Sequence, residues 1–266
     1  MIYFVESIPG GGKSFYSRKL YKSNKNKVIY YKEEYRNPID FVRQAVLSER
    51  EYKALLFEIG ELCENVNEAV NIEKIISKEI TRVDDCIFVP YLHIVAPNEK
   101  IKCRLIDLYM KEYDDGMVSY QEYSDMFLKR LKAFLSSYDS NVDYIFEGAL
   151  LHNPLLTILG FYNLSKSEII KFYNEIYRML DCIQYEINMI CVNSIEETIK
   201  LTAKNRVKAG DFAWQRGFEK WLKNTKKYSG LKEINGIISF AERMNEFQKM
   251  ICEEVPFQKK IIERRI

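Results

Sequence analysis

The sequence predicts an α/β fold in which helices cover both faces of a parallel sheet. Short apolar runs rich in β-forming residues recur along the chain, and segments with helical periodicity or helix-capping patterns lie between them. Strands that alternate with helices in this way pair in parallel, because each helix carries the chain back across the sheet. Ligands of such sheets bind at the carboxyl ends of the strands, so the residues at these ends are the candidates for function.

The first elements predict a strand, a helix and a second strand. Residues 2–5 (IYFV) read as a buried strand, residues 14–22 as a helix, and residues 27–32 (KVIYYK) as the second strand. Residues 38–141 are expected to be mainly helical, with an apolar stretch at residues 87–95 that Pro90 interrupts. No linker interrupts this region. We therefore expect one domain over residues 1–266, with a helical insertion over residues 38–142.

The second half of the chain predicts three further strands. Residues 143–148 form a third strand that ends in Glu147 and Gly148, and residues 183–192 form a fourth, for which a helix is the alternative. Gly230 and Gly236 indicate a turn-rich segment. Further predictions are helices that open at Ser165 and Ser194, helices over residues 211–223 and 239–252, and a last strand over residues 259–263.

Composition restricts the functional classes. The 266 residues are 47% hydrophobic and 29% charged, which is ordinary for a globular protein. The net charge of +2 gives no overall attraction to nucleic acid, and no apolar run approaches membrane-spanning length. Six scattered cysteines without a C-x-x-C pair, and only two histidines, argue against a structural zinc site. The default expectation is a cytoplasmic protein with reduced cysteines.

The strongest motif follows the first strand. Residues 7–14 (SIPGGGKS) match the Walker A pattern G-x-x-x-x-G-K-[ST], except that Ser7 replaces the first glycine. Glycines let backbone N–H groups approach phosphate oxygens, and the following helix presents its positive dipole end. Lysine can neutralise the β- and γ-phosphates, and the serine hydroxyl can bind Mg²⁺. The alternative is a glycine-rich turn. The predicted nucleotide-binding residues are Pro9, Gly10, Gly11, Gly12, Lys13, Ser14 and Phe15, with Ser14 also the metal ligand.

Residues 4–14 resemble the opening of P-loop nucleoside and nucleotide kinases, including thymidylate kinase-like proteins. More closely, the chain resembles a family of largely uncharacterised bacterial P-loop proteins of similar length. That second resemblance is carried by Asn37-Pro38 with Tyr52 downstream, by residues 146–155 (FEGALLHNPL), and by residues 230–243.

The kinase resemblance implies a three-layer P-loop NTPase fold with strand order 2-3-1-4-5. It also implies an acceptor site formed by the insertion after the second strand, and a basic lid over residues 204–230. Arg206 lies where such kinases place lid arginines that contact nucleotide phosphates. The chain departs from the pattern because it has no clear DR-x or ER-S motif after the third strand.

Four further charged residues are candidates for the reaction. Glu147 is expected to assist Mg²⁺ or to act as the general base, and a helix-capping carboxylate is the alternative. Glu33 is a candidate catalytic acid and Glu34 a substrate contact, and a solvated surface pair is their alternative. Arg130 could bind an anionic acceptor, against the simpler interpretation of a solvated helix face.

The resulting hypothesis is a phosphotransferase that uses ATP or GTP with Mg²⁺ on a small hydroxyl-bearing acceptor such as a nucleoside or nucleotide. The alternative is a regulatory NTPase module that acts on a protein partner. A nucleic-acid enzyme is disfavoured by the near-neutral charge. A membrane partner is not expected, a homodimer is left open, and the sequence does not distinguish ATP from GTP.

Overall fold

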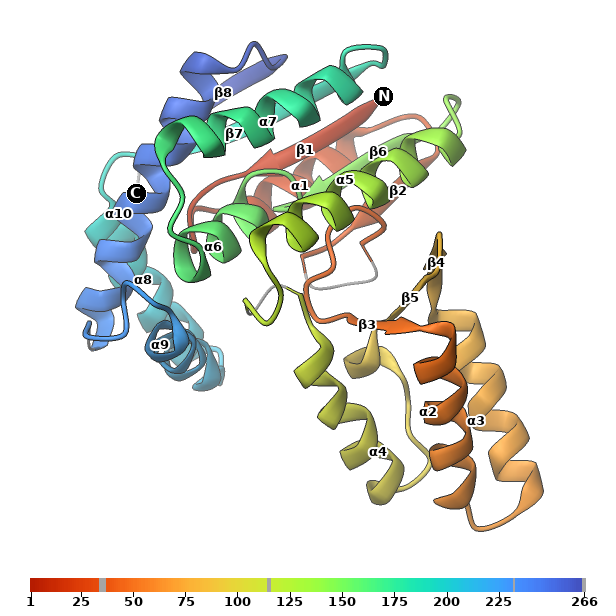
Figure 1. Ribbon diagram of the computed structural model, residues 1–266. Coiled ribbons are helices and arrows are strands. Elements are labelled where there is room, and N and C mark those ends of the chain that lie inside the picture. Colours follow the sequence, from red (N-terminus) through yellow and green to blue (C-terminus); the bar gives the residue numbers. More distant parts are fainter. Residues whose placement is uncertain (34–36, 114–115, 232, 265–266) are drawn as a thin grey trace. The chain divides into compact units, whose positions relative to one another are not determined.

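The computed structural model describes residues 1–33, 37–113, 116–231 and 233–264 (Figure 1). The chain divides into two compact units. Unit 1 combines Met1–Glu33 with Asp139–Ile266, and unit 2 is Glu34–Tyr138. This division differs from the single domain expected over residues 1–266, although unit 2 nearly coincides with the predicted insertion.

Unit 1 contains a sheet of five parallel strands. The strands are β1 (Ile2–Glu6), β2 (Val28–Tyr31), β6 (Asp143–Glu147), β7 (Tyr185–Val192) and β8 (Lys259–Arg264). Their order across the sheet is β2-β6-β1-β7-β8, and each neighbouring pair is parallel. Counted among the strands of this sheet alone, the order is 2-3-1-4-5, as expected. The segment for which a helix was the alternative is a strand, β7.

Both faces of the sheet are buried, which explains why its central strands are almost continuously apolar. On one face, Phe4 stacks against Phe146 with ring centroids 5.5 Å apart. On the other, Val5 and Ile145 belong to a cluster that Tyr16 joins from the first helix. Side chains of successive strand residues point to opposite faces, so a single strand contributes to both cores.

Helices lie on both sides of this sheet (Figure 1). The helices of unit 1 are α1 (Lys13–Ser23), α6 (His152–Phe161), α7 (Lys166–Leu180), α8 (Ile195–Lys208), α9 (Ala213–Asn224) and α10 (Glu233–Glu254). The crossovers β1–α1–β2 and β6–α6–α7–β7 run in opposite directions across the sheet, so right-handed connections place α1 opposite α6 and α7. The result is an α/β fold compatible with three layers.

Two glycines in unit 1 occupy positions that require a glycine, and one of them departs from the sequence prediction. Gly236 was expected in a turn, but it lies inside α10. A Cβ there would approach the Cβ of Leu231 to 3.0 Å, so the glycine permits close packing. Gly148 has φ +73°, in the left-handed region that favours glycine, and it follows β6 at the edge of the sheet where the candidate site lies.

Unit 2 has a separate apolar core and is mainly helical, as expected, with a small sheet that the sequence did not predict. Its elements are β3 (Ala45–Ser48), α2 (Glu49–Glu61), α3 (Val66–Glu79), β4 (Thr81–Val83), β5 (Cys86–Val89), α4 (Glu99–Ile106), α5 (Tyr120–Ser137) and the 3₁₀ turns Tyr91–His93 and Asp107–Lys111. The three strands form an antiparallel sheet in the order β3-β5-β4. Three buried side chains that pack in its core are Leu55, Ile76 and Leu105.

Serine–glutamate pairs spaced three residues apart cap three helices. Ser48 with Glu51, Ser119 with Glu122, and Ser165 with Glu168 form complete capping boxes at the starts of α2, α5 and α7. Each serine oxygen accepts the N–H of the glutamate three residues later, whose carboxylate accepts the serine N–H in return.

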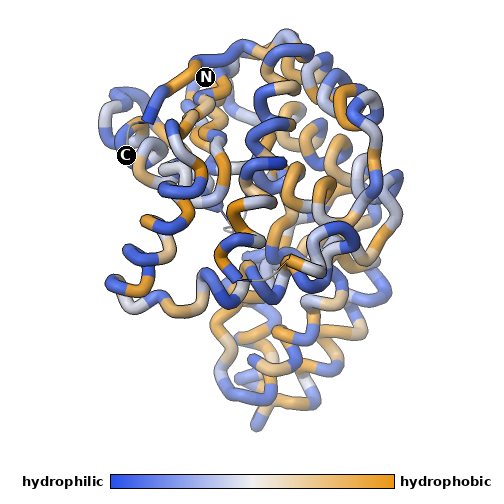
Figure 2. Tube along the Cα trace, turned by 90° about the vertical axis from the view of Figure 1, so that its left-hand side faces the viewer, coloured by the Kyte–Doolittle hydropathy of each residue, from blue (hydrophilic) through white to orange (hydrophobic). Residues whose placement is uncertain are grey.

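Hydrophobic and hydrophilic residues alternate along the helices, so the colour changes repeatedly along the trace in Figure 2. Within the described residues, none of the helices combines the length and the apolar character that crossing a membrane requires.

Candidate functional site

The candidate site begins in the loop that joins β1 to α1 at the carboxyl edge of the main sheet. Gly10 and Gly12 have φ +72° and +103°, so both need the freedom of glycine. Ser7, the departure from the Walker pattern, is fully buried, and its Oγ donates to the carbonyl of Ile190 in β7 at 2.7 Å. Ser7 does not have the positive φ that a glycine would be needed to adopt. The serine therefore anchors the loop without backbone strain.

The start of α1 presents an uncapped helix terminus. Gly12 is the N-cap, no side chain caps the first turn, and that turn has no acidic residue. The first backbone N–H groups of a helix have no acceptor within the helix, and the helix dipole makes this end positive. An anion is the natural partner for such a terminus. Phe15, also predicted to bind nucleotide, lies in this turn with 77% of its surface exposed.

Lys13 is buried and paired. Its Nζ lies 3.3 Å from Glu33 Oε2, and only 6% of its side chain is exposed. His152 approaches the same carboxylate from the start of α6, with Nε2 3.2 Å from Glu33 Oε1. Burial opposes ionisation of Glu33, but the charge of Lys13 outweighs burial and holds the pKa of Glu33 below its usual range, and a cationic His152 would act in the same direction. Glu33 is therefore an ionised partner of the lysine.

The His152 ring is held from both sides. Its Nδ1 lies 2.8 Å from the carbonyl oxygen of Ser7, which can only accept a hydrogen bond. Nδ1 therefore carries a proton, and Nε2 can donate to Glu33 only when the ring is cationic. Burial and the Lys13 charge lower the pKa of His152, while Glu33 opposes them. At neutral pH, Lys13 is consequently the stronger partner of Glu33.

A second cluster joins Ser14, Glu147 and Tyr30. Ser14 Oγ donates to Glu147 Oε1, and Tyr30 Oη donates to Glu147 Oε2 at 2.6 Å. Glu147 ends β6 and is 3% exposed. Burial and the Glu147 carboxylate raise the pKa of Tyr30, so the phenol stays a donor. The hydroxyl of Ser14 and the carboxylate of Glu147 are oxygen ligands of the type that Mg²⁺ prefers.

The side-chain oxygens of Ser14 and Glu147 suit Mg²⁺, which also binds phosphates. Across the residues that the structure describes, there is no group of three or more His, Cys, Asp or Glu side chains able to hold an ion. Mg²⁺ keeps several waters and usually takes one or two protein carboxylates together with substrate phosphates. Ser14 and Glu147 fit that requirement.

Buried Glu6 holds the backbone at the start of α6, next to His152. Its two carboxylate oxygens accept the N–H groups of Leu150 at 2.8 Å and His152 at 2.7 Å. Burial raises the pKa of Glu6 to about 7, although these N–H groups act in the opposite direction. A Cβ on Gly148 would lie 3.3 Å from Lys13 Cε, so this glycine leaves room for the lysine chain.

Two residues reach the loop from distant elements and were missed by the sequence analysis. Arg264, in β8, donates from Nη1 to the carbonyl of Gly10 at 3.1 Å. A Cβ on Gly12 would lie 2.7 Å from the same nitrogen. Thr202 of α8 lies beside Gly10, with Oγ1 3.5 Å from its carbonyl. No motif signals these contacts, because they depend on the position of β8 and α8 beside the loop.

The remaining predicted residues lie apart from this cluster or outside the described residues. Arg206, exposed on α8, pairs with Asp211 at 2.8 Å and stacks over Trp214. Glu34 lies outside the described residues, so its predicted role is not addressed.

Arg130 corrects both sequence interpretations. Its guanidinium is fully buried in unit 2, where it donates to the carbonyls of Asn37 at 2.5 Å and Pro38 at 3.2 Å, and to Gln44 Oε1 at 3.2 Å. It also lies over the ring of Phe88. Arg130 is therefore neither a solvated residue nor available to a substrate, and it fastens the segment that precedes β3.

Searches for similar proteins add no family to this geometry. No protein-family model, no curated protein and no solved structure matches the chain.

Proposed function

We propose that residues 7–14 bind the phosphates of ATP or GTP with Mg²⁺, and that the protein is a phosphotransferase of the P-loop kinase type acting on a small hydroxyl-bearing acceptor. The observation that carries the proposal is the combination at the start of α1. An uncapped helix terminus, two left-handed glycines and a buried lysine converge at one edge of a parallel sheet. A glycine-rich turn without a ligand has no need of a buried ammonium group there.

The ion pair between Lys13 and Glu33 indicates how the buried lysine is stabilised before nucleotide binds. A buried ammonium needs an opposite charge, and Glu33 supplies it while nucleotide is absent. The phosphates of an incoming nucleotide offer Lys13 a second anion. As Lys13 turns to the phosphates, the Glu33 carboxylate loses its main partner and becomes available to accept a proton.

This exchange gives Glu33 a role in phosphoryl transfer. The acceptor oxygen forms a bond to the γ-phosphorus, the bond between that phosphorus and the β,γ-bridging oxygen breaks, and the nucleoside diphosphate leaves. The proton of the acceptor hydroxyl passes to Glu33. Mg²⁺, when bound, would neutralise charge on the phosphates, and Ser14 and Glu147 would hold it. Tyr30 keeps Glu147 oriented towards Ser14.

One observation favours a regulatory NTPase module instead. Both Lys13 and Ser14 have internal carboxylate partners, Glu33 and Glu147. A nucleotide must exchange these contacts, and in this alternative a protein partner recognises that exchange. In this alternative, water replaces the acceptor hydroxyl, and turnover is slow.

The test is the stabilisation of the protein by nucleotide with Mg²⁺. Wild type is compared with Lys13→Ala and with Lys19→Ala, a matched control on the exposed side of α1. At 100 times the dissociation constant, a nucleotide adds about 2.7 kcal/mol to the free energy of unfolding. We expect this gain in wild type and Lys19→Ala and its loss in Lys13→Ala.

Candidate acceptors are then added, and phosphorylated products are detected by mass spectrometry. A product from a nucleoside or nucleotide supports the phosphotransferase. Nucleotide binding without any phosphorylated product from a broad acceptor panel supports the NTPase module. An equal gain in Lys13→Ala and wild type would overturn both proposals.

A further inference from the structure

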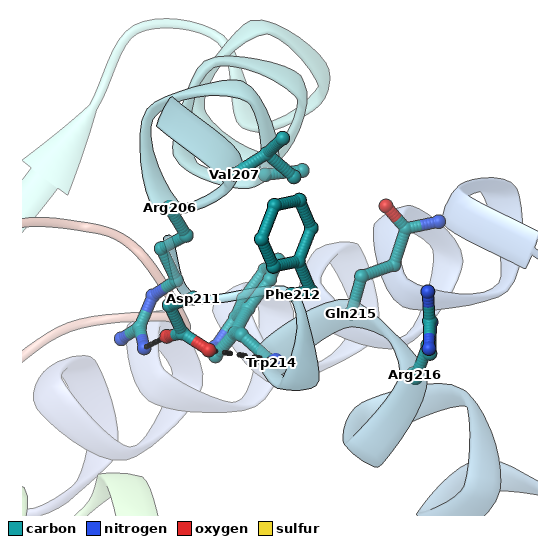
Figure 3. Close-up of a pocket in the computed structure, with 8 residues that line it drawn as sticks. Arg206, Val207, Asp211, Phe212, Trp214, Gln215 and Arg216 are labelled. Carbon is teal, nitrogen blue, oxygen red and sulfur yellow. Dashed lines mark hydrogen bonds and ion pairs between the residues drawn. The ribbon is translucent and has the colours of Figure 1, made fainter. Parts of the chain in front are cut away.

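A pocket of about 190 Å³ lies at the turn between α8 and α9. Its walls combine aromatic and cationic side chains, and six that matter here are Arg206, Val207, Phe212, Trp214, Gln215 and Arg216. Figure 3 shows the Phe212 ring between Val207 and Gln215, with the Arg206–Asp211 pair on one side and Arg216 on the other. The volume is below that of a site for a drug-sized molecule, so the pocket suits one small planar group.

Positive charge is concentrated in the segment of the chain that carries this pocket. Residues 195–228 contain nine lysines and arginines against four aspartates and glutamates, a net charge of +5 in a chain whose net charge is +2. All nine basic side chains are exposed. The near-neutral total therefore conceals a basic segment over α8, α9 and the residues that follow, and the remainder of the chain is acidic. Such an exposed basic segment attracts a polyanion.

Phe212 is exposed without an evident structural reason. It keeps 59% of its surface accessible, and neighbouring Val207 keeps 47%. Two aromatic residues of α9, Phe218 and Trp221, pack inward. The Trp221 ring lies 5.2 Å from Phe240 and 5.6 Å from Phe161, and Phe218 also contacts Phe240. The apolar face of α9 is thus covered. At this turn, a lipid surface could contact only the isolated patch formed by Phe212 and Val207.

We propose that the α8–α9 turn binds single-stranded nucleic acid. One unstacked base lies against Phe212 within the pocket, and the exposed lysines and arginines contact the phosphate backbone. Single-strand binding combines a basic surface with aromatic rings on which bases stack. A duplex keeps its bases stacked and offers none to a single exposed ring. The proposal is independent of nucleotide binding by residues 7–14.

The experiment measures binding of fluorescein-labelled oligo-dT and oligo-U, about twelve nucleotides long, by fluorescence anisotropy. Phe212→Ala is matched by Phe57→Ala, an exposed phenylalanine on α2, and Arg216→Ala by Arg50→Ala, an exposed arginine on the same helix. We expect Phe212→Ala to weaken binding roughly 5- to 150-fold, since that range corresponds to the loss of one stacked base. Phe57→Ala and Arg50→Ala should leave the affinity unchanged.

Salt dependence and fluorescence supply independent readouts. Binding should weaken as salt rises, and Arg216→Ala should reduce the slope of log affinity against log salt by roughly 0.7. Trp214 lines the pocket, so oligonucleotide should change the tryptophan fluorescence, and Trp214→Phe should remove most of that change. Lys13→Ala should bind oligonucleotide as wild type does, so the two proposals can fail separately.

Four results would overturn the proposal. The first is the absence of salt-sensitive oligonucleotide binding, and the second is an equal loss of affinity in Phe212→Ala and Phe57→Ala. The third is full displacement of the labelled oligonucleotide by a mononucleotide at equal nucleotide concentration. The fourth is full displacement by poly-glutamate or duplex DNA. The third would indicate a mononucleotide pocket, and the fourth a surface that responds to negative charge alone.

Discussion

The substitution Glu33→Gln tests the ion pair on which the proposed mechanism depends. Lys13 Nζ and Glu33 Oε2 are 3.3 Å apart, with 6% and 29% of their side chains exposed. At an effective dielectric constant of about 20, two unit charges at this distance attract by roughly 5 kcal/mol. The net value is smaller because solvent reaches Glu33. Removal of one partner of a buried pair costs about 3 kcal/mol. We expect the free energy of unfolding to fall by about that amount without nucleotide.

The same substitution should have the opposite effect on nucleotide affinity. In wild type, the phosphates compete with Glu33 for Lys13, whereas in Glu33→Gln the lysine has no competing anion. If about 1–3 kcal/mol of that competition is relieved, the dissociation constant falls roughly 5- to 150-fold. Turnover should fall as well, because glutamine cannot accept the acceptor proton.

Urea unfolding, isothermal titration calorimetry with Mg-ATP and a product assay measure the three quantities. Glu253→Gln, an exposed acid on α10, is the matched control. The proposed competition between Glu33 and phosphate for Lys13 is refuted if Glu33→Gln is as stable as the control and binds nucleotide no more tightly. A stability loss without tighter binding would mean that Glu33 supports the fold but does not compete with phosphate.

Three further predictions concern neighbouring residues. Ser7→Gly restores the motif glycine but removes the hydrogen bond to Ile190. Urea unfolding should therefore show a free energy of unfolding lower by about 1 kcal/mol, with unchanged nucleotide affinity. Tighter nucleotide binding would show that the serine impairs the loop. Glu147→Gln should leave calorimetric affinity almost unchanged and lower the rate of product formation, and an equal rate would reduce Glu147 to a structural role. The carboxyl carbon resonance of Glu6 should titrate with a midpoint near 7, because burial raises its pKa from 4.5 to about 7. Since the folded pKa is the higher one, ionisation of Glu6 removes roughly 3 kcal/mol of stability as pH rises from about 4.5 to 7; a midpoint near 4.5 would contradict this.

The sequence predicted features that depend on neighbours along the chain. The apolar runs at β1, β6 and β7 specify strands because both faces are buried, and the serine–glutamate spacing specifies the capping boxes. The glycines of the loop were identified for the same reason, since left-handed backbone requires them locally.

Features that depend on the meeting of distant segments were not predicted. Arg264 is separated from Gly10 by most of the chain, and no pattern around it differs from an ordinary strand end. Arg130 lies on an amphipathic helix among other charged residues, so its sequence context favours exposure. Its burial is explained by partners that are remote in sequence, among them the carbonyls of Asn37 and Pro38 and the Phe88 ring.

The discontinuity of unit 1 has a consequence for the order of folding. Lys13 and Glu33 belong to its first segment, whereas Glu147, His152 and Arg264 belong to its second. Central β1 pairs with β6 and β7, so it cannot join the sheet until the intervening chain has closed into a long loop. Unit 2 contains its own core and can shorten that loop by folding first. Nucleotide affinity should therefore appear late during refolding, as a signal that the two segments of unit 1 have joined.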